Sequence, residues 1–140
     1  MHKIKNLLNQ VSFIQKKYND LAEYSGEHYN IFDWFIKCLK NYANFNGRAR
    51  RKEFWFFNLV YFGLLLIISG LFGSQSPLLI LLLLSMFLPA LAVSTRRLHD
   101  IGKSGWWYLI SFTGIGYFLL IFWWATEGDN HSNPYGEPTK

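Results

Sequence analysis

The sequence lacks ionisable residues over two long stretches. No Asp, Glu, Lys or Arg occurs from Phe54 to Thr95, and none occurs from Ser104 to Thr126. Helices of soluble proteins carry polar residues every turn or two, because one face of each helix meets water. Hydrophobic residues also make up 51% of the 140-residue chain. These gaps exclude an ordinary soluble domain and indicate segments that cross a membrane.

Cysteine is almost absent as well. Cys38 is the single cysteine, which excludes a disulfide framework and a cysteine-based zinc site. The first 30 residues have no continuous apolar core, so no cleavable signal peptide is expected. The sequence has no phosphate-binding glycine loop, no paired carboxylates and no Ser-His-Asp arrangement. We therefore predict no catalytic residue, no metal site and no cofactor, and expect a protein that is not an enzyme.

The two charge-free stretches have the length of membrane spans. A helix needs about 20 apolar residues to cross a bilayer, so residues 54–95 correspond to two crossings. The turn-forming residues Gly73 to Pro77 separate them. Tryptophan pairs at 106–107 and 123–124 resemble the aromatic belts at the two ends of a third crossing. The predicted fold is an all-α membrane protein with three transmembrane helices, near 54–73, 77–95 and 106–126.

The positive charge is concentrated on one predicted side of the membrane. Of the fourteen Lys and Arg residues, ten precede residue 54 and three lie in 96–105, and the formal net charge is +5. A hairpin of two spans brings both basic segments to the same face, and the positive-inside rule makes that face cytoplasmic. This distribution favours a membrane surface over a nucleic acid. It predicts a multi-pass membrane protein with a cytoplasmic N-terminus and a C-terminus on the far side of the membrane.

Two amphipathic helices are predicted before the first span. The first carries apolar residues at helical spacing, at Ile4, Leu7, Leu8, Val11, Ile14, Tyr18 and Leu21. It packs either on the protein itself or in a dimer, or it docks on a partner or on anionic lipid. The second, over 32–43, is rich in aromatic residues and is expected at the membrane interface. The predicted divisions are an arm over 1–30, a membrane domain over 31–126 and a polar tail over 127–140.

Two clusters of cations flank the predicted spans. Arg48, Arg50 and Arg51 precede the first span, and Arg96, Arg97 and Lys103 follow the second. Because arginine binds phosphate in a bidentate manner, one hypothesis is that these six residues form a pocket for an anionic lipid headgroup or another phosphate.

Three other ionisable residues are predicted to form a structural polar cluster. Glu53 is expected to pair with Arg97 or Arg51, and Asp100 with Arg96, Arg97 or Lys103. His99 is expected to bond a carbonyl group.

Three ordered motifs carry a family resemblance. They are Gly47-Arg48-Ala49-Arg50-Arg51-Lys52-Glu53-Phe54-Trp55, then Arg96-Arg97-Leu98-His99-Asp100 with Ser104-Gly105-Trp106-Trp107, then Asn133-Pro134-Tyr135-Gly136. Together they resemble the bacterial inner-membrane family called domain of unknown function 805, over roughly residues 32–138. The resemblance implies a small protein embedded in the bacterial inner membrane, which would make the far side, with the C-terminus, periplasmic. It lends no reaction.

The expected role is that of an accessory or organising membrane protein. It would act through contacts with the lipid bilayer, with anionic lipid, with other copies of itself or with an unknown membrane protein. The alternative is a small oligomeric channel or transport component. Asn58 is the one strongly polar residue inside the first span, and a pore needs polar groups at mid-membrane.

Overall fold

The computed structural model describes residues 2–25 and 28–139, and over these residues the chain is helical with no β-strand. Gly26 and Glu27, in the predicted arm, lie outside the described residues, as do Met1 and Lys140. The elements in order are α1 (His2–Ser25), α2 (Ile31–Lys40), α3 (Arg51–Phe72), α4 (Pro77–Asp100), the 3-10 helix η1 (Gly105–Thr113) and α5 (Ile115–Ala125). The all-α class is confirmed.

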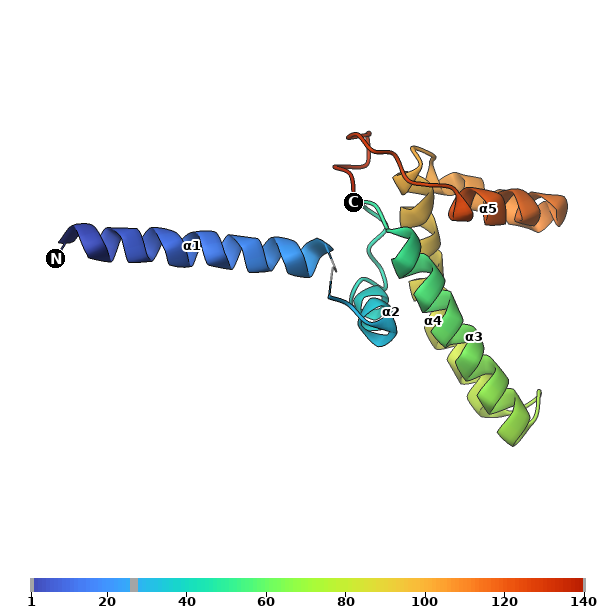
Figure 1. The fold of residues 1–140 in the computed structure, drawn as a ribbon. Helices are drawn as coiled ribbons and strands as arrows, with labels where there is room; N and C mark the ends of the chain where they lie inside the picture. The colour runs from blue at the N-terminus through green and yellow to red at the C-terminus, as the bar shows by residue number, and fades with distance from the viewer. Residues whose placement is uncertain (1, 26–27, 140) are drawn as a thin grey trace.

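The helices α3 and α4 form an antiparallel hairpin (Figure 1). The turn between them begins at Gly73, which ends α3 with a φ of 84°, a conformation that glycine adopts without strain. Ser76 caps α4 by accepting a hydrogen bond from the Leu78 amide, and Pro77 occupies the first helical position, where its missing N–H costs nothing. The predicted break between two long apolar helices is therefore confirmed.

Both hairpin helices expose most of their apolar side chains. Leu66 is 74% exposed and Leu84 is 71% exposed. At 22 and 24 residues, the helices are about 33 and 36 Å long, which is enough to cross a hydrocarbon layer of about 30 Å. Apolar helices of this length that cover so little of each other need an apolar solvent, since an exposed patch of this size is rare on a soluble monomer.

The buried core lies at one end of the hairpin, which we call the base. There α2 packs across the start of α3, and the Phe35 and Phe57 rings stack with centroids 5.4 Å apart. Asn30 begins α2 with a capping box, in which Asn30 and Asp33 each bond the other's backbone amide. The core residues come from α2, from α3 and the segment before it, from α4 and from α5: Cys38, Ala49, Phe54, Phe57, Val93, Leu98, Leu120 and Trp124.

The prediction of one continuous helix over 106–126 is wrong. This stretch is divided into η1 and α5, which pack against each other around Gly114, whose φ is 71°. A Cβ at Gly116 would clash with the Ile110 backbone, so glycine permits this close approach. As a result Trp107 and Trp123, predicted at opposite ends of a span, lie in edge contact with centroids 5.5 Å apart.

The reversal in η1 and α5 returns the tail to the base. In Figure 1 the red C-terminal segment runs back over the end of α4. The Asp129 amide donates to the Asp100 carbonyl at 2.8 Å, and the tail residues Gly128 and Thr139 are buried. The expectation that the tail lies across the membrane from the basic segment 96–105 is therefore wrong, because the two segments are in contact.

The predicted N-terminal amphipathic helix forms as α1, which stands apart from the other helices in Figure 1. Within the described residues it makes no packing contact with another helix, and Leu8 and Ile14 are 62% and 64% exposed. Two of the predicted apolar positions, Tyr18 and Leu21, fall where side chains are not described. Packing of this helix on the base of the same chain is not observed. Its packing in a dimer and its docking on a partner or on anionic lipid stay predictions.

Candidate functional site: a buried ion-pair cluster at the base of the hairpin

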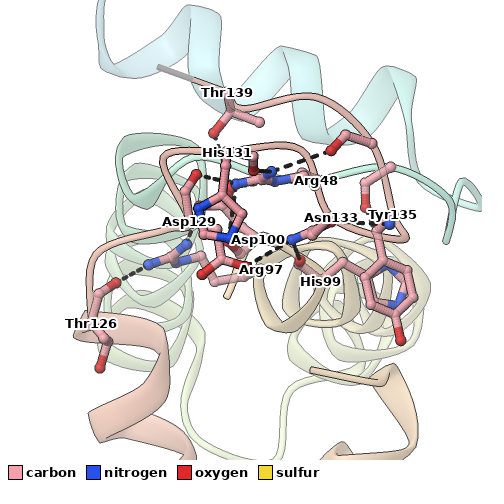
Figure 2. A network of polar contacts seen from close by, with 12 residues as sticks. Arg48, Arg97, His99, Asp100, Thr126, Asp129, His131, Asn133, Tyr135 and Thr139 are labelled. Atoms are coloured by element: carbon pink, nitrogen blue, oxygen red, sulfur yellow. Dashed lines mark hydrogen bonds and ion pairs between the residues drawn. The ribbon is translucent and has the colours of Figure 1, made fainter. Parts of the chain in front are cut away.

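Asp100 is the centre of the first ion-pair group. The helix α4 extends through Arg96 and Arg97 to Asp100, one turn beyond the predicted end of the span. Arg48 donates from Nε to Asp100 Oδ1 at 2.9 Å, and Arg97 donates from Nη1 to Oδ2 (Figure 2). Thr139 also donates its hydroxyl to Oδ1, at 3.0 Å. Both carboxylate oxygens are thus occupied, and Asp100 is only 2% exposed.

The same two arginines hold the tail and the end of α5 through backbone carbonyls. Arg48 donates to the carbonyls of His131 at 3.0 Å and Asp129 at 2.6 Å. Arg97 donates from Nε to the Trp124 carbonyl at 3.0 Å and from Nη2 to the Thr126 carbonyl. A planar guanidinium presents five N–H donors, so one side chain can join several segments. Arg48 and Arg97 therefore connect the start of α3, the end of α4 and the tail.

His99 and the tail add a second set of contacts. The His99 ring stacks on Tyr135 with centroids 3.9 Å apart, and its Nδ1 lies 3.1 Å from the Gly47 carbonyl oxygen. Asn133 donates its side-chain amide to the His99 carbonyl at 2.9 Å (Figure 2). The expected carbonyl partner of His99 is confirmed, and the histidine joins α4 to both the segment before α3 and the tail.

Glu53 is the centre of the second ion-pair group. It accepts a hydrogen bond from Arg96 Nη1 at Oε1, while Lys37 Nζ lies 3.5 Å from Oε2. The predicted partners were Arg97 or Arg51, so an internal ion pair forms as expected but the choice of arginine was wrong. Glu53 is 1% exposed and Arg96 is 4% exposed. This pair connects α2, α3 and α4.

Cys38 packs beside this second group. Its Sγ lies 3.8 Å from Glu53 Oε1, and the residue is fully buried. Burial, and then the neighbouring Glu53 carboxylate, raise the pKa of the Cys38 thiol far above its usual range. The thiol is therefore protonated and unreactive, as a cysteine with a core role would be.

A cavity of about 300 Å³ opens beside Arg96. Its wall includes Lys37 from α2, Arg50 from the segment before α3, and Glu53. Arg96 also lines the cavity, and its Nε and Nη2 are buried without a hydrogen-bond partner among the described residues.

The six cations predicted to form one basic pocket are divided among different surroundings. Arg48, Arg50 and Arg96 line this cavity, and Arg97 lies in the Asp100 group. Lys103 Nζ lies over the Trp123 ring, 4.4 Å from its centroid, and Arg51 forms an exposed pair with Glu127 at 4.0 Å. Anionic-lipid binding by this set stays a prediction, whereas the pairing of Asp100 with Arg97 is confirmed.

Sequence reasoning missed several members of the base. Lys37 and Cys38 come from α2, and Thr139 and the tail carbonyls come from the other end of the chain. The Asn133-Pro134-Tyr135-Gly136 motif was the one available signal, because Asn133 and Tyr135 both contact His99. Backbone carbonyls leave no signature in a sequence.

The arrangement has the chemistry of a structural cluster. Within the described residues, no three His, Cys, Asp or Glu side chains are placed to hold a metal ion. Both buried carboxylates, Glu53 and Asp100, accept from arginines, and the His99 ring is enclosed by Gly47 and Tyr135. These groups join the helices and the tail to one another.

Comparison with known proteins identifies the family. A family model described as a protein of unknown function, DUF805, matches residues 42–137. The chain belongs to this family. The matched range contains Arg48, Glu53, Arg96, Arg97 and Asp100, whereas Lys37, Cys38 and Thr139 lie outside it. The DUF805 motifs therefore coincide with the buried ion pairs.

Curated relatives of this DUF805 protein are known in Escherichia coli. Inner membrane protein YhaI of strain K12 is 44% identical over 112 residues, which covers 76% of this chain and 95% of YhaI. Inner membrane protein YhaH of the same strain is 38% identical over 119 residues, which covers 77% of this chain and 97% of YhaH. No solved structure matches the chain. The names of these relatives and the two long apolar helices together support a membrane protein.

Proposed function

We propose that this DUF805 protein is a non-enzymatic protein of the inner membrane, which acts by presenting surfaces to lipid, to further copies of itself or to a partner protein. The engagement of the buried ionisable groups carries the proposal: Asp100 and Glu53 bind arginines, Arg48 binds backbone carbonyls of the tail, and Arg97 binds a carbonyl at the end of α5. A catalytic site would keep such groups available to a substrate. Here they fix the shape of the base.

The proposed topology has two crossings. The apolar helices α3 and α4 would span the bilayer, with the turn from Gly73 to Ser76 on the far side. The base, the tail and the N-terminal arm would all lie in the cytoplasm, because Arg50, Arg51, Lys52 and Lys103 lie at the base end. The helices η1 and α5 would enter the membrane surface from the cytoplasmic side and return to it.

Labelling with a membrane-impermeant maleimide tests this topology. Single cysteines would be placed at Gln75 in the turn and at Ser132 in the tail, both exposed, in a Cys38→Ser background. We expect Gln75→Cys to react in intact spheroplasts and Ser132→Cys to react only in inverted vesicles. Labelling of Ser132→Cys from the periplasmic side would overturn the two-crossing topology and restore a third crossing.

The channel alternative receives no support from the polar residue within the span. Asn58 donates its side-chain amide to the Phe54 carbonyl at 2.8 Å, one turn back on the same helix. A pore-lining group would face an aqueous path. We therefore keep the contact-based role as the single proposal.

A further inference from the structure

Arg96 differs from the other two buried arginines. Arg48 and Arg97 each donate hydrogen bonds from Nε, Nη1 and Nη2, whereas Arg96 donates only from Nη1, to Glu53. Among the described residues its Nε and Nη2 have no partner, although the side chain is only 5% exposed. Buried donors are nearly always bonded, and leaving charged ones unsatisfied is costly. We call Nε and Nη2 the free edge of this guanidinium, and a bound acceptor would satisfy both donors.

The cavity beside Arg96 has the size and the lining residues to hold such an acceptor. It measures about 300 Å³ and lies between α2, the segment 41–50 and the end of α4. This volume is at the lower end of the range of known small-ligand sites, about 300–1,000 Å³. The side chains of Asn44 and Asn46 line it together with the charged residues. The wall is concave and includes several charged and amide-bearing residues, so a small hydrophilic group would find hydrogen-bond partners there.

The charge of the wall selects an anion. Lys37, Arg48, Arg50 and Arg96 contribute four positive charges, and Glu53 contributes one negative charge. Within the described residues, the buried charges of the whole base also leave an excess of cation, since three buried arginines face only Glu53 and Asp100. An oxyanion in the cavity would complete the hydrogen bonds of Arg96 and balance this excess.

We propose that this cavity binds a phosphate group, held by the free edge of Arg96 together with Arg50 and Lys37. The three cations come from α4, from the segment before α3 and from α2, so they approach the cavity from different sides. Such an arrangement suits the several oxygens of a tetrahedral phosphate, whereas a planar carboxylate is satisfied by a single guanidinium.

Two sources share this chemistry. The cavity lies at the base, where the apolar parts of α3 and α4 begin, and this is the depth of lipid phosphates if the hairpin spans the bilayer. The headgroup of an anionic phospholipid is therefore one source, and free phosphate is the other. The binding does not depend on which side of the membrane the base faces, so it is separable from the proposed topology.

The experiment measures retained lipid and thermal stability on the purified full chain in mild detergent. Native mass spectrometry would compare added phosphatidylglycerol with phosphatidylcholine of the same acyl chains. Thermal unfolding would compare sodium phosphate with sodium chloride at equal ionic strength. Arg50→Gln removes a cation of the cavity wall, and Lys52→Gln is the matched control, because Lys52 is exposed and lies outside the cavity.

We expect the wild type and Lys52→Gln to retain one phosphatidylglycerol per chain, and Arg50→Gln to bind it about tenfold more weakly, the loss expected for one charge-assisted hydrogen bond. Arg96→Lys keeps a cation beside Glu53 while it removes Nε and Nη2, and the same weakening is expected. If Arg96→Lys does not fold, the result for Arg50→Gln alone tests whether the cavity binds phosphate.

The two arms distinguish the source of the phosphate. Stabilisation by sodium phosphate that Arg50→Gln abolishes would show that the free anion suffices, and retention of phosphatidylglycerol alone would show a lipid site. Equal retention of both lipids by the wild type and by Arg50→Gln would overturn the proposal. So would identical behaviour of the wild type, Arg50→Gln and Lys52→Gln in both arms.

Discussion

Single buried charges determine how the base is assembled. Asp100 accepts from Arg48, Arg97 and Thr139, and those donors come from three separate parts of the chain. Buried ion pairs add little net stability compared with apolar residues, but removal of one partner strands the other charge. The ion pairs therefore specify one position for the tail, which a purely apolar base would leave less defined.

Substitution of Asp100 by Asn tests this dependence. The change strands two buried guanidinium groups, so we expect the free energy of unfolding in detergent to fall by about 3–5 kcal/mol. Glu127→Gln is the control, since its pair with Arg51 is exposed and long, at 4.0 Å, and such pairs contribute about 0–1 kcal/mol. Equal effects of the two substitutions in denaturant titrations would contradict the central role of Asp100.

The thiol of Cys38 gives a second residue-scale prediction. Because burial and Glu53 raise its pKa, the group keeps its proton at about pH 9, where an ordinary thiol is largely ionised. Alkylation by iodoacetamide requires the thiolate. We expect slow alkylation of the folded protein at that pH and rapid alkylation after unfolding in dodecyl sulfate, measured by mass. Comparable rates in the two states would show that the thiol is accessible and ionised.

The sequence predicted some of these partners and missed others for a geometric reason. Consecutive helical residues point about 100° apart, so Arg96 and Arg97 face different neighbours once α4 continues past them: Arg96 contacts Glu53 on α3, and Arg97 contacts the end of α5. Charge alone does not distinguish the two. Which arginine pairs with Glu53 depends on the rotation of α4, which is set by packing at the base.

At the scale of elements, length and hydropathy predicted α3 and α4 well. They also predicted one helix over 106–126, where the chain forms η1 and α5. A charge-free run of about 20 residues satisfies the length rule in either case. The difference arises from Gly114, with its positive φ, and from the close approach of Gly116 to Ile110. A pair of glycines is common enough in membrane helices that it did not predict a reversal.

Gly114→Ala tests the reversal. An L-residue at a φ of 71° is strained by about 1–2 kcal/mol, so we expect the free energy of unfolding to fall by that amount. Gly63→Ala is the matched control, because Gly63 lies within α3 with open space around its Cα and alanine favours a helix by about 1 kcal/mol. The two substitutions should therefore have opposite signs. A stabilising Gly114→Ala would indicate a continuous helix.

At the scale of the whole molecule, α1 is the part with an unoccupied apolar face. Tryptic cleavage after Lys16 or Lys17 in proteoliposomes reports whether that face is covered by lipid or by another copy. We expect Leu8→Asp to accelerate cleavage several-fold, because a charge on the apolar face opposes its burial, and Asn9→Asp to leave the rate unchanged. Leu8 is 62% exposed in the isolated chain. Equal rates of tryptic cleavage for the two variants would show that neither lipid nor another copy covers the apolar face of α1.

The contacts of Arg48 with the tail also have a consequence for synthesis. Arg48 leaves the ribosome more than eighty residues before its partners at His131 and Gly136. Until those residues emerge, Arg48 lacks the carbonyl acceptors that the tail supplies. The base is therefore completed last, and contacts so distant in sequence form slowly. A chain interrupted before residue 126 would keep the pairs of Asp100 with Arg48 and Arg97 but would leave donors of both arginines without their carbonyl partners.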